Sequence, residues 1–371
     1  MTGNIGSSSS PSESPYRSPF GSTITGTGSA FPKNSVSNEA LCERLGKLGL
    51  EELPGFGPQW IEERTGIRSR GLSTPGDEAD FNSSLGWQAS LRALEMAGKT
   101  ALDIDAIFYA TCTPDTIIPS TACWLQKKLG AKNAFAFDLN AACSGFVFAL
   151  STADQFIKSG QVKTALVVGA DVLSAFTNWE DRKSCIVFAD GAGAAIVERT
   201  PANARNRILA SHLKSDGEAW DLFQIRAGGS NQEVTEEMHS ARLDKMQMKG
   251  TEIFKAAVKT MATFAAQTLE SHGLAESDID WIVPHQANLR LMEAVARRLG
   301  ASSEKFLVNI DRVGNTSAAT VPTVLDEAVR SGKIKPGQLL LMDVFGAGLT
   351  YGTLLLRWGP ATTELTGESR T

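Results

Sequence analysis

One cysteine in this sequence has the surroundings of a nucleophile. Cys143 follows the apolar segment Ala134–Leu139 and precedes apolar residues at helical spacing, so it lies at a predicted strand-to-helix turn among small residues. A thiol at a helix N-terminus faces unpaired N–H groups and the positive end of the helix dipole, and both lower its pKa. Cys143 therefore suits covalent catalysis on a substrate carbonyl, with a buried packing role as the alternative.

Two further residues occupy similar strand-to-helix turns, and a third segment is a glycine-rich turn between two apolar runs. His285 follows a predicted buried strand and precedes a helix, and ligands gather at strand ends in α/β proteins. Asn315 follows the apolar run Phe306–Ile310, a predicted strand, and precedes another helix. Taken singly, the two residues also suit a core histidine and a turn asparagine. Phe345–Gly352 is a glycine-rich turn whose N–H groups could reach a substrate oxygen, but it lacks the lysine of a phosphate-binding loop.

The elements that position these residues alternate between strands and helices. Short apolar runs predict buried strands, and apolar residues at helical spacing predict helices. This alternation is typical of an α/β protein with largely covered sheets. The predicted strands are Ala106–Ala110, Leu166–Gly169, Trp281–Val283 and Leu339–Val344, and the predicted helices are Leu85–Ala97, Gly145–Ser159, Thr251–Ser271, Leu289–Leu299 and Val321–Ser331.

Two short repeats indicate that the fold contains two similar halves. The segment DIDAI at 103–107 returns as DIDWI at 278–282, and the tripeptide GAG at 191–193 returns at 346–348. Their common order and similar spacing predict a duplication, in which Asn315 takes the place in the second half that Cys143 takes in the first. The break between the halves falls near residue 200, where Pro201–Arg207 has the composition of a linker.

Composition excludes several classes of protein. The 371 residues include 36 Lys and Arg against 41 Asp and Glu, and the net charge of −5 argues against bulk nucleic-acid binding. No uncharged run is long enough for a membrane span. Five scattered cysteines indicate a reducing, cytoplasmic compartment and no zinc site. We expect a disordered Ser/Pro-rich tail over 1–22, order from about Ile24, an N-terminal half over 23–200 and a C-terminal half over 208–359.

Together these segments resemble the β-ketoacyl-acyl carrier protein synthase III family of thiolase-fold condensing enzymes. Between Ile24 and Trp358 the resemblance is carried by ITGTGSAFP, WIEERTGIRSR, AACSGF, DGAGAA, PHQANLR, GNTSAA and FGAGLTYG. It implies a duplicated five-layer α/β/α/β/α fold and a homodimer. It also implies a catalytic triad of Cys143, His285 and Asn315, with no metal ion and no cofactor, since acyl-coenzyme A is a substrate.

The reaction that the resemblance implies initiates fatty-acid synthesis. Cys143 would take an acyl group from acyl-coenzyme A, and malonyl-acyl carrier protein would then lose carbon dioxide and condense with that group. His285 and Asn315 would stabilise the enolate, while the backbone N–H groups of Cys143 and Ala347 would hold the oxyanion. The family often has glycine where this chain has Ala347.

Six residues match family positions that bind coenzyme A. Indole and guanidinium planes stack on bases, which suits three of them to an adenine clamp, and the others match the tunnel for the pantetheine chain. The clamp residues are Trp60, Arg64 and Arg182, and the tunnel residues are Thr251, Phe254 and Asn288. The family often has asparagine at the position of Thr251.

The resemblance also assigns functions at the surface. Four cations match the rim of the tunnel, where an acidic carrier protein would dock, although as a plain pattern they suit a solvated helix face. They are Lys255, Arg290, Arg297 and Arg298. Ile118 matches a gate of the acyl pocket that the partner subunit supplies. Phenylalanine there restricts some members to acetyl groups, so we expect this chain to accept longer primers.

Several other enzymes share part of this pattern. Thiolases use a second cysteine in the C-terminal glycine turn, and Phe345–Gly352 has none. Plant-type polyketide synthases share the triad, but the docking cations and the shorter chain favour the synthase III branch. A specialised-metabolism (polyketide-type) condensing or acyl-transfer enzyme of that branch is the main alternative. A cysteine hydrolase would release free acid without a carbon–carbon bond, and a non-catalytic homologue would normally lack part of the triad.

Overall fold

Two mixed sheets carry the architecture of the chain. The computed structural model describes residues 18–47, 49 and 55–360. In these residues the strand order is β1-β7-β6-β4-β5 in the first sheet and β11-β12-β13-β8 in the second. The strands are β1 (Phe20–Ala30), β4 (Ala106–Ala110), β5 (Phe135–Leu139), β6 (Thr164–Val172), β7 (Asp190–Pro201), β8 (Ile208–Ser215), β11 (Trp281–Pro284), β12 (Leu339–Gly346) and β13 (Thr350–Arg357).

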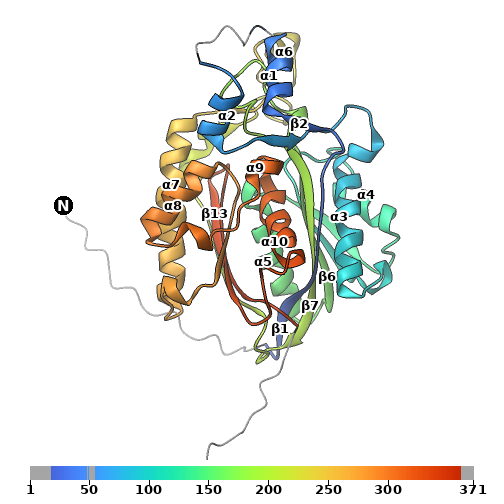
Figure 1. The fold of residues 1–371 in the computed structure, drawn as a ribbon. Helices are drawn as coiled ribbons and strands as arrows, with labels where there is room; N and C mark the ends of the chain where they lie inside the picture. Colours follow the sequence, from blue (N-terminus) through green and yellow to red (C-terminus); the bar gives the residue numbers. More distant parts are fainter. Residues whose placement is uncertain (1–17, 48, 50–54, 361–371) are drawn as a thin grey trace, which may run out of the picture.

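Helices form three layers, one outside each sheet and one between the two sheets (Figure 1). Two helices cover the outer face of each sheet, α3 and α4 on the first and α7 and α8 on the second, while α5 and α10 lie between the sheets. This arrangement is the predicted five-layer α/β/α/β/α sandwich. The helices are α3 (Asn82–Ala97), α4 (Thr121–Leu129), α5 (Gly145–Lys158), α7 (Gly250–Ser271), α8 (Leu289–Leu299) and α10 (Thr320–Arg330).

The position of each helix follows from its apolar residues. Phe146 and Leu150 of α5 pack with Val321 and Leu325 of α10 in one cluster that includes strands of both sheets. Burying each of these large side chains stabilises the fold by about 1.5–3 kcal/mol. In contrast, α8 buries one face, which includes Val295, and exposes arginines on the other, as expected of an outer layer.

The two sheets repeat one strand pattern. Across each sheet, a parallel pair (β4 and β6, or β11 and β12) lies beside two further strands (β7 and β1, or β13 and β8). Each of these further strands runs antiparallel to the strand before it. Strands β4 and β11, strands β6 and β12, and helices α5 and α10 all begin at the spacing that separates DIDAI from DIDWI. That repeat therefore marks the duplication. The GAG match does not, because residues 191–193 lie inside β7 whereas residues 346–348 end β12 and form the turn after it.

The N-terminal boundary differs from the prediction. β1 begins at Phe20, which pairs with Pro201 of β7 and packs against the Arg199 guanidinium, 4.3 Å from its ring centre. The last three residues of the predicted tail over 1–22 therefore belong to the sheet, and residues 1–17 of that tail lie outside the described residues. Pro201–Arg207 connects β7 to β8, and a domain boundary at this connection stays a prediction.

The run Phe306–Ile310 forms less of a strand than its apolar residues predict. Only Phe306 joins a sheet, through a single bridge to Ile282 of β11. The short helix α9 (Ile310–Val313) begins at the end of the run, and the Ile310 side chain is buried among residues of α7 and α8. The apolar residues thus serve packing beneath the outer helices more than strand pairing.

Smaller elements close one end of the sandwich (Figure 1). Arg70 is fully buried there and donates hydrogen bonds to the Ile186 carbonyl and the Asn38 side chain, which joins segments distant in sequence. These elements are α1 (Asn38–Gly46), α2 (Pro58–Thr65), α6 (Glu236–Ser240), the pair β2 (Ser35–Ser37) and β3 (Ser69–Gly71), and the pair β9 (Phe223–Gln224) and β10 (Gln247–Met248). None of the described helices is long and apolar enough to cross a membrane.

Candidate active site

Cys143 lies immediately before α5, as the sequence predicts. It belongs to a 3₁₀ turn, Ala142–Ser144, between the end of β5 and the start of α5, and only 7% of the residue is exposed. Ala142 adopts a left-handed backbone with φ of 47°, and its N–H donates to Oδ1 of Asn140 at 3.1 Å. This turn presents the thiol to a cavity.

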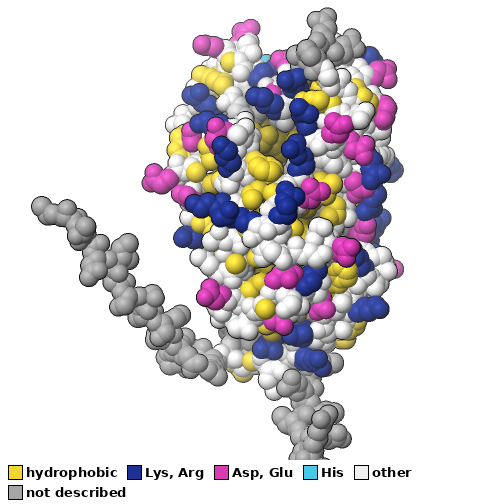
Figure 2. All heavy atoms as spheres, turned by 60° about the vertical axis from the view of Figure 1, so that its left-hand side comes forward, with side chains coloured by type: hydrophobic (Ala, Val, Ile, Leu, Met, Phe, Trp, Pro, Cys, Tyr) yellow, Lys and Arg dark blue, Asp and Glu magenta, His cyan; other side chains and the backbone are white. Residues whose placement is uncertain are grey.

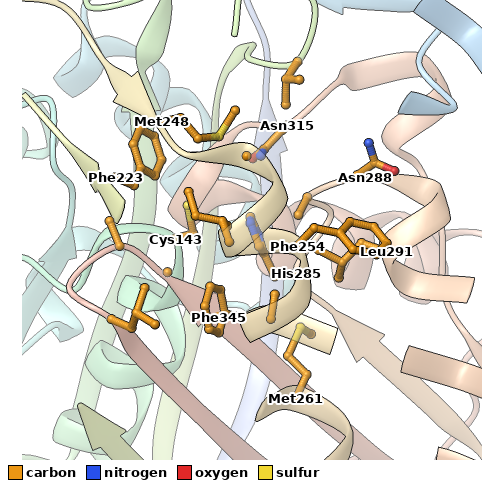
Figure 3. Close-up of a pocket in the computed structure, with 18 of the residues that line it drawn as sticks. Cys143, Phe223, Met248, Phe254, Met261, His285, Asn288, Leu291, Asn315 and Phe345 are labelled. Atoms are coloured by element: carbon orange, nitrogen blue, oxygen red, sulfur yellow. The ribbon is translucent and has the colours of Figure 1, made fainter. Parts of the chain in front are cut away.

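The cavity beside Cys143 brings the three predicted catalytic residues together (Figure 3). It has a volume of about 140 Å³, and Cys143, His285 and Asn315 all line it. An apolar cavity with a few convergent polar groups suits a substrate whose reacting group lies at the thiol. Its other walls are mainly apolar and include Val187, Phe188, Phe223, Met248, Ile253, Phe254, Ala257, Met261, Leu291, Phe345 and Leu349.

His285 follows β11 and is 3% exposed. Its Nδ1 lies 2.7 Å from Oγ1 of Thr320, the first residue of α10. Its Nε2 has no hydrogen-bond partner in the part of the chain that the structure describes. Burial lowers the pKa of His285 to about 3, so the imidazole is neutral near pH 7 and carries one N–H.

Backbone groups orient the side chain of Asn315. Its Oδ1 accepts the N–H of Ser317 at 2.9 Å, so the oxygen is occupied and the Nδ2 donors remain for the cavity that Asn315 lines. Its backbone carbonyl accepts the N–H of Ala189 at 2.9 Å, and its own N–H donates to Val187 at 3.2 Å. These hydrogen bonds hold Asn315, in the second half, against the segment of the first half that leads into β7.

The protonation of Cys143 differs from the sequence-based expectation. Burial raises the pKa of the thiol to about 12, with a smaller contribution from the nearby Asp171 carboxylate, while the Ser317 hydroxyl and a backbone hydrogen bond act in the opposite direction. The predicted lowering of this pKa is therefore wrong, because loss of hydration outweighs the favourable contacts at the helix start.

The glycine turn between β12 and β13 faces the turn that carries Cys143. A methyl group on Gly346 would lie 2.9 Å from the backbone nitrogen of Cys143, so the close approach requires glycine. Thr350 Oγ1 donates to the Ala141 carbonyl at 2.8 Å and fastens the two turns together. Ala347 lines the same cavity, so its backbone lies beside the predicted oxyanion position.

A wider, outer cavity adjoins the cavity beside Cys143, and the predicted coenzyme A residues line it. Its volume is about 540 Å³. The two cavities have five lining residues in common, namely Val187, Met248, Gly250, Phe254 and Asn288. Four of the predicted residues line only the outer cavity, namely Trp60, Arg64, Arg182 and Thr251. With Phe254 and Asn288 at the junction, all six border one passage to Cys143.

In the predicted adenine clamp, the arginine side chains already lie against the Trp60 ring. The guanidinium of Arg64 lies 4.2 Å from the centre of the Trp60 ring, and that of Arg182 lies 5.5 Å from it. Both are within the range of cation–π contacts. A stacked base needs about 3.5 Å to each neighbour. Arg182 must therefore move away from Trp60 for a base to stack between them.

Asn288 serves the structure of the passage wall. Its Oδ1 caps α8 by accepting the N–H of Arg290 at 2.9 Å, and its Nδ2 donates to the Arg64 carbonyl at 2.9 Å. Both ends of the amide are thus engaged by backbone groups. The residue contacts the passage as predicted, but its hydrogen bonds hold α8 to α2.

Lysine and arginine side chains surround a hollow whose floor is hydrophobic (Figure 2). The cations that line the outer cavity are Arg64, Arg182, Lys183, Lys255 and Arg290. Arg297 and Arg298 are exposed on α8 but line neither cavity. They lie about two helical turns, roughly 10 Å, beyond Arg290. Only two of the four predicted docking residues therefore border the passage itself.

Ile118 lies apart from the passage. It is 85% exposed, beside Ile117 at 86%, in the connection between β4 and α4, and it lines neither cavity. Phe135 and Phe137, on the edge strand β5, are also exposed. Within one chain Ile118 thus cannot act as a gate.

Several residues that shape the site were not identified from the sequence. The Ser317 hydroxyl acts to lower the pKa of the Cys143 thiol, and Thr320 holds His285. The available signal is the three hydroxyl residues that follow Asn315 within five positions in GNTSAAT, which include Ser317 and Thr320. Phe223 and Met248 line the cavity from β9 and β10, which are too short to give a periodic pattern.

The ligand-binding groups of the passage are aromatic, cationic and amide side chains. Among the described residues, no group of three or more His, Cys, Asp or Glu could hold a metal ion. Indole and guanidinium groups at the outer cavity suit a substrate that contains a base and phosphates.

Comparisons with known proteins agree with this architecture. Family models for 3-oxoacyl-[acyl-carrier-protein (ACP)] synthase III match residues 137–217, and for its C-terminal part residues 269–358. A β-ketoacyl-[acyl-carrier-protein] synthase III of Thiobacillus denitrificans is 46% identical over 338 residues, which cover 91% of this chain and 99% of that protein.

Solved structures give the same result. The 3-oxoacyl-[acyl-carrier-protein] synthase III of Aquifex aeolicus VF5 matches with a TM-score of 0.80 and 39% identity, over 91% of this chain and 100% of that one. A priming β-ketosynthase from the R1128 polyketide biosynthetic pathway matches with a TM-score of 0.81 and 32% identity, over 94% and 100%.

The duplicated five-layer fold, with a buried cysteine before a central helix, defines a thiolase-fold condensing enzyme. The chain belongs to the β-ketoacyl-[acyl-carrier-protein] synthase III family. The family and the fold that the sequence motifs predict are both confirmed.

Proposed function

We propose that the chain condenses an acyl-coenzyme A primer with malonyl-acyl carrier protein, which initiates fatty-acid synthesis. The products are β-ketoacyl-acyl carrier protein, coenzyme A and carbon dioxide. One observation carries the proposal: a single passage runs from Trp60 to a small cavity where Cys143, His285 and Asn315 meet. The names of the relatives describe the same carrier-bound β-ketoacyl product.

In the first half-reaction, the Cys143 sulfur attacks the thioester carbonyl of acyl-coenzyme A. The bond between that carbonyl and the coenzyme A sulfur breaks, and the proton lost from Cys143 leaves on the coenzyme A thiol. The raised pKa of Cys143 favours departure of this proton as the sulfur attacks. The N–H groups of Cys143 and Ala347 hold the oxyanion of the tetrahedral intermediate.

In the second half-reaction, the malonyl thioester enters by the same passage. The bond to its carboxylate breaks, carbon dioxide leaves, and the electron pair forms an enolate on the thioester oxygen. His285 and Asn315 donate hydrogen bonds to that oxygen, a role that suits a neutral imidazole and a free amide N–H. The enolate carbon then attacks the acyl group, and Cys143 leaves and regains a proton.

The carrier protein docks on the cations around the mouth of the passage. Lys255 and Arg290 border the outer cavity, and Arg297 and Arg298 extend the positive surface along α8. The whole chain has a net charge of −5, so this surface is a local feature. Its main effect is on the rate of association with an acidic carrier protein, and salt weakens it.

A second copy of the chain completes the acyl pocket. The edge strand β5 exposes Phe135 and Phe137, at 44% and 37%, and a two-fold related β5 would cover both. In that homodimer Ile118 reaches the partner's cavity, and its side chain admits primers longer than acetyl. The described cysteines are free thiols, which suits a cytoplasmic enzyme, and the reaction uses neither a metal ion nor a cofactor.

A specialised pathway is the second candidate for the same chemistry. The similarity to a priming β-ketosynthase of polyketide biosynthesis favours it, at 32% identity over 94% of this chain. Both pathways use one reaction type. The carrier protein whose malonyl thioester is condensed fastest distinguishes them.

The proposed function is tested by product analysis. Purified protein is incubated with acyl-coenzyme A and malonyl-acyl carrier protein labelled at the free carboxyl group, and labelled carbon dioxide and carrier-bound β-ketoacyl product are quantified together. The proposal expects equal amounts of both. Free acid without carbon dioxide would instead indicate a hydrolase. Parallel reactions with carrier proteins from fatty-acid and polyketide systems assign the pathway.

A further inference from the structure

A buried hydroxyl lies on the side of His285 that faces away from the cavity. Thr320 Oγ1 is 2.7 Å from Nδ1, and the two residues are 1% and 3% exposed. The other ring nitrogen, Nε2, has no partner among the described residues, and His285 lines the inner cavity. The direction of this one hydrogen bond therefore decides which nitrogen offers a proton to a substrate.

The Thr320 hydroxyl has one proton and two acceptors within reach. One is the Ser317 carbonyl at 2.8 Å, and the other is Nδ1 of His285 at 2.7 Å. The Ser317 carbonyl also accepts the backbone N–H of Thr320, so it has a donor without the hydroxyl. Nδ1 has no second neighbour that could donate to it in the described structure. The hydroxyl is thus the group that can keep Nδ1 unprotonated.

The repeat shows that the helix itself does not need this hydroxyl. Thr320 opens α10, and its counterpart in the first half, Gly145, opens α5 without a side chain. Both central helices begin with the same 3₁₀ turn. Because only the second half has a hydroxyl at this position, we infer that the Thr320 hydroxyl serves the active site and not the helix.

We propose that the Thr320 hydroxyl donates to Nδ1 of His285 and so fixes the tautomer that carries its proton on Nε2. Thr320 is then a positioning residue for decarboxylation, which rests on the proposed role of His285 as a donor to the enolate. In the opposite arrangement Nδ1–H donates to Thr320, and Nε2 presents a lone pair that repels the enolate oxygen. Only the first arrangement lets His285, beside Asn315, donate to the oxygen.

Nitrogen NMR of the ring tests the tautomer directly. The full-length protein is labelled with ¹⁵N-histidine, and His285→Ala assigns the His285 signals among the four histidines. The expected result is a protonated Nε2 and an Nδ1 shifted as a hydrogen-bond acceptor. Thr320→Ser should keep both signals, and Thr320→Val should lose the acceptor shift of Nδ1. A protonated Nδ1 in the unmodified protein, or an unchanged Nδ1 in Thr320→Val, would overturn the proposal.

Kinetics separate this proposal from the proposed function. Thr320→Val should slow decarboxylation of malonyl-acyl carrier protein about tenfold, the size of one lost hydrogen bond, and Thr320→Ser should restore it. Acylation of Cys143 should change less than about twofold, because it does not use the Nε2 donor. Unmodified protein that fails to decarboxylate malonyl-acyl carrier protein contradicts the proposed function. Equal decarboxylation by unmodified protein and Thr320→Val contradicts the role of Thr320 alone.

Discussion

Asn140 and Asn315 hold equivalent places in the two halves of the molecule, at the same spacing as the DIDAI and DIDWI segments. Each accepts, through Oδ1, the backbone N–H of the residue two positions later, at 3.1 Å and 2.9 Å. Those two residues, Ala142 and Ser317, have left-handed backbones with φ of 47° and 53°. Each opens the 3₁₀ turn that precedes a central helix, so the duplication has preserved the turn and its asparagine.

This relationship corrects the expected equivalence of Cys143 and Asn315. At the spacing of the duplication Cys143 is matched by Ala318, and Asn315 is matched by Asn140. The first half therefore places a nucleophile on the turn, and the second places an amide three positions before the corresponding one. Two copies of one turn provide different groups to a single cavity.

Asn315→Asp should separate the two half-reactions. The aspartate keeps the oxygen that accepts the Ser317 N–H but replaces the Nδ2 donor with a second oxygen. We expect decarboxylation of malonyl-acyl carrier protein to fall at least about 100-fold, as for loss of one oxyanion donor, while acylation of Cys143 persists. Asn140→Asp is the matched control and should decarboxylate at close to the original rate. Equal losses in both variants would refute the assignment.

Alkylation of Cys143 should accelerate steadily with pH. Only the thiolate reacts, and with a pKa of about 12 its fraction rises about tenfold per pH unit throughout the range from 7 to 9. Peptide mass spectrometry after iodoacetamide treatment gives the rate at Cys143 apart from the other cysteines. A plateau near neutral pH would mean that the free enzyme already holds a thiolate.

Asp343 should make stability depend on pH. Its carboxyl is buried, neither oxygen has a partner among the described residues, and burial raises its pKa to about 8. Between the unfolded pKa near 3.9 and this value the folded state binds more protons, so wild-type stability falls as pH rises and the loss ends above about pH 8.

Asp343→Asn removes that titration and isolates its effect. Relative to the original protein, the variant should gain about 1.4 kcal/mol of unfolding free energy for each unit from pH 5 to pH 7. Urea unfolding at both pH values measures the difference. Parallel pH dependence of the two proteins would contradict a protonated Asp343.

Ile118→Phe should narrow the range of primers. A larger, flat ring at the proposed gate is expected to retain acetyl-coenzyme A turnover and to reduce that of isobutyryl- and octanoyl-coenzyme A by tenfold or more, about the effect of one or two misfit methylene groups. Ile117→Phe is the matched control, since Ile117 is equally exposed on the same loop. Should both variants keep the original primer profile, Ile118 is not the gate.

The sequence predicts the elements whose signals are local. The apolar run Ala106–Ala110 coincides with β4, and the amphipathic segment Leu289–Leu299 coincides with α8, because each is buried on the faces that its own pattern describes. The motifs also located Cys143, His285 and Asn315, which line one cavity.

Properties that depend on several distant segments were not predictable in this way. The pKa of Cys143 depends on burial and on Ser317 and Asp171, and neither residue is near it in sequence. The contact between His285 and Thr320 joins residues 35 positions apart. The strand predicted over 306–310 is mostly absent, because burial beneath helices and burial in a sheet select the same apolar residue types.

The role of Cys143 is tested most simply by the mass of the intact protein after incubation with acetyl-, isobutyryl- and octanoyl-coenzyme A. We predict a gain of one acyl group that Cys143→Ala abolishes and that Cys123→Ala, which removes an exposed free thiol, leaves intact. A protein that gains no acyl group from any of the three donors, or a Cys143→Ala variant that still gains one, would contradict the assignment of Cys143 as the nucleophile.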